Sequence, residues 1–160
     1  MISKTGFGGG CHWCTEAVFS SLAGVERVEQ GFIRSSPPSD TWSEAVLVSF
    51  KPEALDLETL IDIHVQTHSA FSHHKLRGKY RSAVYFLNES QERDCKTELA
   101  RIQSMHDEQL VTQALPFAGF KASDERFQNY FENDPDRPFC RTYIMPKLKR
   151  LQVSHPEKLK

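Results

Sequence analysis

Three consecutive glycines, Gly8-Gly9-Gly10, separate two stretches of different hydrophobic periodicity and constrain the fold more than any other feature. A short apolar run over residues 2–7 precedes them and is typical of a strand. The run over residues 12–22 has the period of a helix, which Ala23-Gly24 ends. Glycine lets the backbone turn tightly and leaves the approach to it open. The sequence therefore predicts a strand-to-helix turn, with Cys11 at the start of the helix.

The rest of the chain alternates between strand-like and helix-like stretches, without an internal repeat or a low-complexity segment. Strands are expected over residues 25–33, 43–50, 80–87 and, at a sheet edge, 111–117. Helices are expected over residues 57–67, 90–106 and 123–131, and Asp56 has the residue type and position of an N-cap. The segments 34–40 and 69–79 are polar and lack a period.

The order β-α-β-β-α-β, followed by additions, predicts an α+β protein. We expect a ferredoxin-like, split βαβ two-layer sandwich with an extra C-terminal helix and a coil tail. The 160 residues are 39% hydrophobic and 26% charged, which is typical of a soluble globular protein with a substantial core. We therefore expect a single domain over residues 1–160, with its core in residues 2–132 and its coil tail in residues 133–160.

The charge balance argues against two classes of partner. The chain has 20 basic and 21 acidic residues and a net charge of −1, so we expect no broad attraction to nucleic acid or to an anionic membrane. No apolar run reaches transmembrane length, and the N-terminus lacks the apolar stretch of a secretory signal. These features predict a cytoplasmic protein.

The chain has four cysteines, Cys11, Cys14, Cys95 and Cys140, too few for a disulfide scaffold in a protein of this length. Three interpretations of the Cys11/Cys14 pair compete: a redox or nucleophilic pair, half of a zinc site, or two small apolar core residues. The glycines and the helix start favour the first. Backbone N–H groups and the positive end of the helix dipole would stabilise a Cys11 thiolate there.

The zinc interpretation draws on two histidines. His64 and His68 stand four positions apart on an expected helix and would share a face. Together with Cys11 and Cys14 they could form a Cys₂His₂ site, although the stretch from Cys14 to His64 is far longer than in a zinc finger.

Glu44 is the second informative residue. One face of its strand carries Trp42, Glu44, Val46, Val48 and Phe50, because side chains alternate along a strand. The other face, with Ala45, Leu47 and Ser49, is smaller and less apolar, so we expect Glu44 to point inward. A carboxyl group withdrawn from water favours its protonated form and can act as a general acid.

Three other residues have both a structural and a functional interpretation. Trp13 could line an apolar pocket or pack against the sheet. Tyr80 could offer its hydroxyl to a cleft, although a tyrosine at a strand start is more often structural. Glu16 lies in the first turns of its helix, where the helix dipole favours a negative side chain.

These motifs resemble those of the methionine sulfoxide reductase A family. Residues 9–16 resemble its Gly-Cys-Phe-Trp-x-x-Glu signature, residues 43–46 its Ala-Glu-Ala-Val, and residues 80–85 its Tyr-Arg-Ser-Ala-Ile-Tyr. Weaker similarities follow in the family's order over nearly the whole chain, at residues 22–25, 31–32, 117–120, 128–131 and 134–140.

The resemblance implies reduction of methionine S-sulfoxide, free or in peptides and proteins. Cys11 would attack the sulfoxide sulfur as a thiolate and become a sulfenic acid. Glu44 would protonate the sulfoxide oxygen, to which Tyr80 would donate a hydrogen bond. A second thiol, Cys140 or its rival Cys14, would then form a disulfide that thioredoxin or another dithiol reduces. No metal or other cofactor is implied, and we expect a monomer.

The chain also departs from the family's pattern. His12 replaces the aromatic residue that, with Trp13, would hold the methyl group of the substrate, and imidazole is smaller, more polar and titratable. A second active-site tyrosine before Glu44 has no clear match. Two alternative functions therefore stand beside the reductase: a thiol–disulfide oxidoreductase that uses Cys11 and Cys14, and a structural zinc module.

Overall fold

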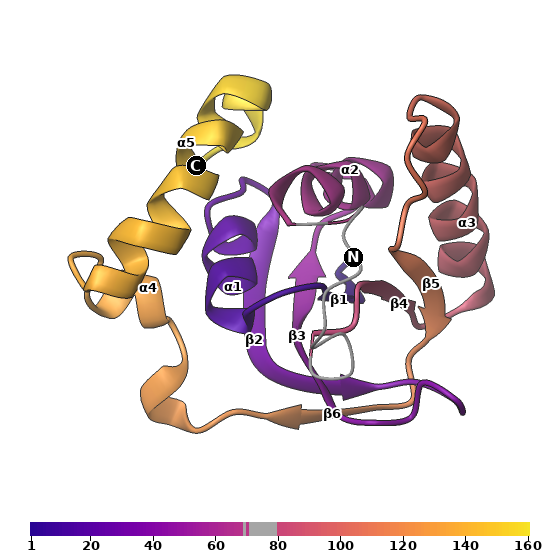
Figure 1. Cartoon of the computed structure of the whole chain (residues 1–160), viewed down its shortest axis with the longest axis horizontal. Coiled ribbons are helices and arrows are strands. Elements are labelled where there is room, and N and C mark those ends of the chain that lie inside the picture. Colours follow the sequence, from indigo (N-terminus) through magenta and orange to yellow (C-terminus); the bar gives the residue numbers. More distant parts are fainter. Residues whose placement is uncertain (69, 71–79) are drawn as a thin grey trace.

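A computed structural model describes residues 1–68, 70 and 80–160 (Figure 1). Its sheet has six strands: β1 (Ser3–Gly8), β2 (Val25–Arg34), β3 (Ser43–Phe50), β4 (Ala83–Phe86), β5 (Gln113–Pro116) and β6 (Gly119–Ala122). The α-helices are α1 (His12–Ser20), α2 (Leu57–Thr67), α3 (Glu89–Ser104), α4 (Tyr130–Asn133) and α5 (Met145–Ser154). The protein is therefore of the α+β class, as predicted.

The strands follow the spatial order β5-β4-β1-β3-β2-β6. β4 and β5 run parallel, and the other neighbouring pairs run antiparallel. Gly8, the last residue of β1, pairs with Ala45 on one side and Ala83 on the other. The chain therefore leaves the centre of the sheet next to Glu44 and enters α1 there.

The main core lies between one face of the sheet and the first three helices. Figure 1 shows α1 and α2 next to each other over this face and α3 farther along the sheet. This core includes the fully buried side chains of Phe7, Val46, Val48 and Val84 from the strands and of Phe19, Leu60 and Ile61 from the helices. A smaller cluster around Ile33, Ala45, Ala83 and Tyr85 covers part of the opposite face.

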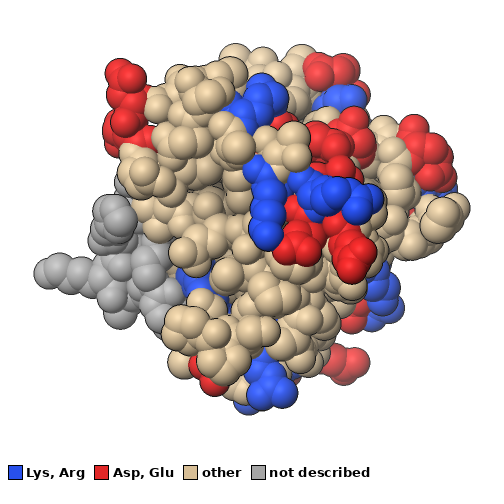
Figure 2. Space-filling view, turned by 90° about the vertical axis from the view of Figure 1, so that its right-hand side faces the viewer, with Lys and Arg blue, Asp and Glu red and all other residues tan. Residues whose placement is uncertain are grey.

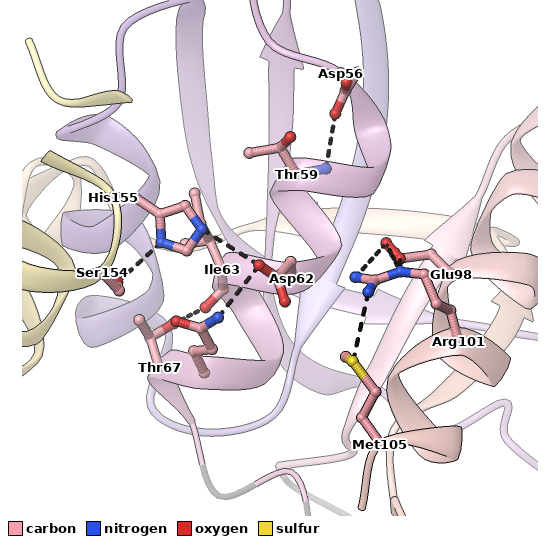
Figure 3. Close-up of polar contacts among 11 residues, drawn as sticks. Asp56, Thr59, Asp62, Ile63, Thr67, Glu98, Arg101, Met105, Ser154 and His155 are labelled. Carbon is pink, nitrogen blue, oxygen red and sulfur yellow. Dashed lines mark hydrogen bonds and ion pairs between the residues drawn. The ribbon is translucent and has the colours of Figure 1, made fainter. Parts of the chain in front are cut away.

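The bounds of β3 and α2 were predicted without error, because local sequence signals define both elements. Asp56 caps α2 as expected, because its side chain accepts a hydrogen bond from the Thr59 N–H at 2.8 Å (Figure 3). Asn88 caps α3 in the same way, accepting from the Gln91 N–H at 2.9 Å. Such caps satisfy N–H groups that the first turn of a helix leaves without partners.

The strand expected over residues 80–87 is shorter, since β4 begins only at Ala83. The preceding residues form other contacts: the Arg81 N–H donates to Ser43 Oγ at 2.8 Å, and the Arg81 guanidinium donates to the Thr41 carbonyl at 2.8 Å. Tyr80 is therefore a half-buried residue of the segment before the strand.

The helix expected over residues 123–131 is wrong. A 3₁₀ turn, Glu125–Phe127, and the four-residue α4 occupy this segment instead, after the unpredicted strand β6. Polar side chains draw the backbone out of a continuous helix, because the Gln128 amide donates to the Gln30 carbonyl at 2.8 Å and the Ser123 hydroxyl donates to Gln30 Oε1 at 2.9 Å.

The coil tail predicted from residue 133 is also wrong. A π-helical turn, Cys140–Ile144, leads into α5, where Pro146 lies in the first turn and needs no N–H partner. The helix is held by burial of Leu151, which is 1% exposed, and by contact of His155 Nε2 with Asp62 Oδ2 of α2 at 3.3 Å (Figure 3). The apolar face of α5 is too short to give a clear helical period in the sequence, so this helix was not predicted.

The aperiodic segment 69–79 lies outside the described residues, apart from Ala70. Figure 2 shows acidic and basic side chains interspersed on the face that carries α3, where Lys96 Nζ lies 2.6 Å from Glu92 Oε2. None of the helices over residues 1–68, 70 and 80–160 combines the length and the apolar character that crossing a membrane requires.

Candidate active site

Cys11 is the N-cap residue of α1, as the glycine-rich turn predicted. Its thiol is half-buried and receives a hydrogen bond from the Cys14 thiol, which lowers the pKa of Cys11 below its ordinary value. Burial and the charge of Glu44 raise the pKa, whereas the N–H groups of Trp13 and Cys14 lower it further. The net effect favours the thiolate, the form in which cysteine is a nucleophile.

The turn before Cys11 needs glycine because other parts of the chain approach its backbone. A β-carbon on Gly9 would lie 2.5 Å from His68 Cδ2, and one on Gly8 would lie 3.0 Å from the Arg81 carbonyl oxygen. Gly10 has nothing this close to it within the described residues. This open approach leads directly to Cys11.

Glu44 points into the core side of β3, as its strand alternation predicted, and is 7% exposed. Its Oε1 accepts a hydrogen bond from the main-chain N–H of His12 at 3.3 Å. The carboxyl group therefore lies at the start of α1, beside the residue that follows Cys11.

The ring of His12 lies between two parts of the sheet. Its Nδ1 donates to the Gly31 carbonyl at 2.9 Å, and its Nε2 faces Glu44 Oε1 at 3.5 Å. The edge of the ring meets Phe32, with the ring centroids 5.4 Å apart. His12 is 7% exposed, so these contacts are withdrawn from water.

Cys14 lies one helical turn after Cys11 and donates its thiol hydrogen to the Cys11 sulfur. This hydrogen bond raises the pKa of Cys14, burial and the negative charges of Cys11 and Cys140 add to the effect, and Lys147 opposes it. The two cysteines are therefore unequal: these contacts favour the thiolate form of Cys11 and the protonated form of Cys14.

Lys147 of α5 lies close enough to the sulfurs of Cys11 and Cys14 for its charge to act on both. Its ammonium group donates to the Thr67 carbonyl, and burial lowers its pKa while the charges of Cys14 and Cys11 raise it. A small cavity of about 40 Å³ lies between these groups. It is lined by Gly10, Cys11, Cys14, Thr15, Val18, His64, Thr67, His68 and Lys147.

An aromatic cluster covers Trp13. The Tyr130 ring stacks on the indole at 4.1 Å and 8°, and the Phe139 ring meets it edge-on at 5.3 Å and 88°. Trp13 thus forms part of an apolar wall together with Tyr130 and Phe139, which come from segments distant in the sequence.

Glu16 binds the segment that carries Tyr130, which corrects the helix-dipole role expected for it. Its carboxylate accepts the N–H of Asn129 at 2.8 Å and of Tyr130 at 3.2 Å, and it accepts from the Gln30 amide at 2.9 Å. Burial raises the pKa of Glu16, and these three donors lower it.

Comparison with known proteins decides the family to which this site belongs. Residues 3–159 match the family described as peptide methionine sulfoxide reductase. The chain is 30% identical to the peptide methionine sulfoxide reductase MsrA of Pasteurella multocida, over 98% of each. The chain belongs to the peptide methionine sulfoxide reductase family.

Solved structures support the same fold. Mxr1 from Saccharomyces cerevisiae in reduced form superposes with a TM-score of 0.76 at 18% identity, covering 89% of this chain and 91% of that chain. Mxr1 in complex with Trx2 gives a TM-score of 0.65 at 17% identity, covering 81% and 84%.

The remaining cysteines of this reductase family member are buried. Cys140 is 0% exposed, packs in one cluster with Cys14, and directs its thiol to the Asp134 carbonyl at 3.6 Å. Burial raises the pKa of Cys140. Cys95 lies in the main core, where burial raises its pKa to about 12. Cys14, one helical turn after Cys11 as the sequence indicated, is the cysteine whose thiol donates to the Cys11 sulfur.

The histidines of the zinc hypothesis have other partners. His64 Nε2 lies 2.8 Å from the Gly8 carbonyl oxygen, and His68 Nε2 lies 2.8 Å from Ser82 Oγ. Within residues 1–68, 70 and 80–160, no group of three or more His, Cys, Asp or Glu side chains is arranged to hold a metal ion. The family membership also favours the redox interpretation of Cys11 and Cys14.

Sequence analysis assigned no site role to Lys147, Tyr130 or Phe139, which the structure places around α1. Each comes from the C-terminal third and meets α1 only through the tertiary fold. Tyr130 lies 114 positions from its partner Glu16, so no local pattern could have paired them.

Proposed function

We propose that this family member reduces methionine S-sulfoxide, with Cys11 as nucleophile and Glu44 as general acid. The observation that carries the proposal is the Cys11 thiol at the start of α1, with donors that lower its pKa and a buried carboxyl group beside the next residue. A nucleophile and an acid in one shielded site are what sulfoxide reduction requires.

In the proposed reaction, the Cys11 thiolate attacks the sulfoxide sulfur and Glu44 protonates the oxygen. The S–O bond of the sulfoxide and the transient bond between the two sulfurs then break, and the oxygen ends on the cysteine sulfur. The thiolate, one proton and the sulfoxide thus become a cysteine sulfenic acid and methionine. The cysteine sulfur loses two electrons, and the methionine sulfur gains them.

Three residues are proposed to hold the substrate. Trp13 and His12 would contact its methyl group, and the Tyr80 hydroxyl would donate to the sulfoxide oxygen. Tyr80 precedes Arg81, whose N–H is bonded to Ser43, the neighbour of Glu44, and this connection supports its role. The stacked Tyr130 ring supports an apolar wall at Trp13.

We propose Cys14 as the first resolving thiol. Its sulfur is already in contact with that of Cys11, so condensation with the sulfenic acid gives a Cys11–Cys14 disulfide and water. Cys140, to which the family resemblance points, packs in the same cluster as Cys14. It is proposed to attack Cys14 next, releasing Cys11 as a thiolate and leaving a Cys14–Cys140 disulfide.

Thioredoxin is the proposed reductant of this disulfide, a role supported by the complex of the structurally similar Mxr1 with Trx2. The proposal includes free and protein-bound substrates and no metal or other cofactor. The proposal also takes the chain as a single domain. The β4-β1-β3-β2 order within its sheet supports a ferredoxin-like core. The monomeric state and the cytoplasmic location stay predictions.

Replacement of Glu44 tests the acid role. The Glu44→Gln variant should reduce the S epimer of a methionine sulfoxide peptide roughly 10²–10⁴-fold more slowly in a single turnover, as expected when a general acid is lost. Glu98→Gln is the matched control, because Glu98 is equally buried but lies on α3 beside Arg101. Equal rates for Glu44→Gln and the unmodified protein would remove Glu44 from the reaction.

Disulfide mapping tests the order of thiols. Protein oxidised by one equivalent of sulfoxide, quenched with a maleimide and digested should contain the Cys11–Cys14 disulfide first. A Cys140→Ser variant should form that disulfide at the same rate, whereas Cys14→Ser should not form it. Early formation of a Cys11–Cys140 disulfide instead would make Cys140 the first resolving thiol.

A further inference from the structure

We propose that His12 is a positioning residue that shares one proton with Glu44 and returns a proton to that carboxyl after each reduction. The inference rests on the proposed function, because it takes Glu44 as the acid. It assigns a role to the residue at which this chain departs from the aromatic pattern of its family.

The orientation of the imidazole follows from its fixed partner. The Gly31 carbonyl can only accept a hydrogen bond, so His12 Nδ1, at 2.9 Å, must carry the hydrogen. Nε2 is then the nitrogen that gains or loses a proton. It lies 3.5 Å from Glu44 Oε1, and proton exchange is proposed to occur when the two side chains approach to hydrogen-bond distance.

The carboxyl group is held for this exchange by a second contact. The His12 main-chain N–H donates to the same Oε1 at 3.3 Å, so both ends of His12 meet one oxygen of Glu44. The two side chains are each 9% exposed, and the Phe32 ring closes one edge of the imidazole. Little water competes for the proton, and charges interact more strongly there than in solvent.

Other titratable groups surround this pair. Cys11 precedes His12 on α1, and the charge of Glu44 raises the pKa of its thiol. Lys147 of α5 and His68 at the end of α2 line a cavity together with Cys11. Tyr80 comes from the segment before β4, next to the Arg81–Ser43 hydrogen bond. Gly31 and Phe32 bring no charge from β2.

The proton balance gives His12 its function. Each reduction removes one proton from Glu44 and leaves a carboxylate. Solvent water then protonates Nε2 of the neutral His12, and this proton passes to Glu44, so that the pair again holds one shared proton. An imidazole in general keeps a proton to higher pH than a carboxyl group does, and two groups that share a proton lose it as a unit.

The pH dependence of the reaction reports this coupling. The rate rises with pH as Cys11 ionises and falls again, on the alkaline limb, as the pair loses its proton. In His12→Phe, which restores an aromatic ring, and in His12→Gln, which stays polar but cannot titrate, the alkaline limb should move to lower pH. A movement of about one pH unit lowers the rate about tenfold at pH values above the limb.

The experiment is single-turnover reduction of the S-epimer peptide by the full chain between pH 5.5 and 9.5, each profile being scaled to its own maximum. We expect the alkaline limbs of both variants at lower pH than that of the unmodified protein. In the unmodified protein, the NMR signal of His12 Cε1 should change over the same pH interval as the alkaline limb, a readout independent of catalysis.

Three results would overturn the inference. Superimposable profiles for all proteins would reduce His12 to a wall of the substrate site, while leaving Glu44 and the proposed function intact. An unshifted limb in His12→Gln alone would show that a hydrogen bond, without proton exchange, is sufficient. A His12 signal that does not follow the limb would separate the ring from the acid. By contrast, an undiminished rate in Glu44→Gln would refute the proposed acid itself.

Discussion

The hydrogen bond from the Cys14 thiol is the largest influence that lowers the pKa of Cys11, and its removal gives a measurable prediction. Cys14→Ala deletes the donor and leaves the N–H groups of α1 in place. A hydrogen bond to a charged acceptor contributes about 1.5–3 kcal/mol. A factor of ten in an ionisation constant corresponds to about 1.4 kcal/mol, so the pKa of Cys11 should rise and the proportion of thiolate at pH values below that pKa should fall about 10- to 100-fold.

The assay is the rate of alkylation by iodoacetamide as a function of pH, with mass spectrometry of the peptide that contains Cys11. The midpoint of the rate curve reports thiolate formation at this residue alone. Cys14→Ser keeps a donor in the same position and should restore most of the low midpoint. Cys95→Ala is the control, because Cys95 lies in the main core away from α1's start.

Two outcomes would refute this reasoning. A Cys14→Ala midpoint equal to that of the unmodified protein would mean that the helix start alone stabilises the thiolate. A Cys14→Ser shift as large as that of Cys14→Ala would mean that packing around the sulfur, and no hydrogen bond, sets the pKa.

The further predictions concern Lys147, Glu16 and the Asp56 cap of α2. Lys147→Met should slow formation of the Cys11–Cys14 disulfide, measured by rapid quench, because Lys147 lowers the pKa of Cys14. Lys149→Met, at an exposed position of the same helix, is the control. Equal rates of disulfide formation in Lys147→Met and the unmodified protein would contradict this role of Lys147. Glu16→Gln should lower the free energy of unfolding by about 1–3 kcal/mol in urea, since its amide would face the N–H groups of Asn129 and Tyr130, whereas exposed Glu108→Gln should have no effect. Burial also raises the folded-state pKa of Glu16, so the folded protein binds more protons at this residue than the unfolded chain does. The contribution of Glu16 to the free energy of unfolding should therefore fall as pH rises from about 4.3 through the folded-state pKa. A Glu16→Gln variant whose stability has the same pH dependence as that of the unmodified protein would contradict this. Asp56→Ala should cost about 1 kcal/mol through loss of the α2 cap, and an unchanged urea midpoint would argue against it.

The sequence predicted the elements whose signals are local. β3 alternates cleanly over its whole length, and α2 begins at a capping aspartate, so both were placed correctly. The position of Cys11 follows from the glycines before it, and the inward direction of Glu44 follows from the two-residue period of a strand. These features need no knowledge of distant residues.

The parts that were not predicted depend on long-range contacts. The tail has too narrow an apolar face to indicate α5, which is held by Leu151 and by the His155–Asp62 contact. Glu16 has the position of a residue that stabilises its own helix, but three donors from elsewhere bind its carboxylate. Lys147 carries no motif and becomes part of the site only because α5 packs beside α1.

The most direct test of the account is single-turnover reduction of the separate S and R epimers of a methionine sulfoxide peptide, without added reductant. The unmodified protein should convert the S epimer only, and Cys11→Ser should convert neither, while Cys95→Ser should match the unmodified protein. Full S-epimer reduction by Cys11→Ser, or no reduction of either epimer by the folded, reduced protein, would contradict the assignment of Cys11 as the nucleophile of this site.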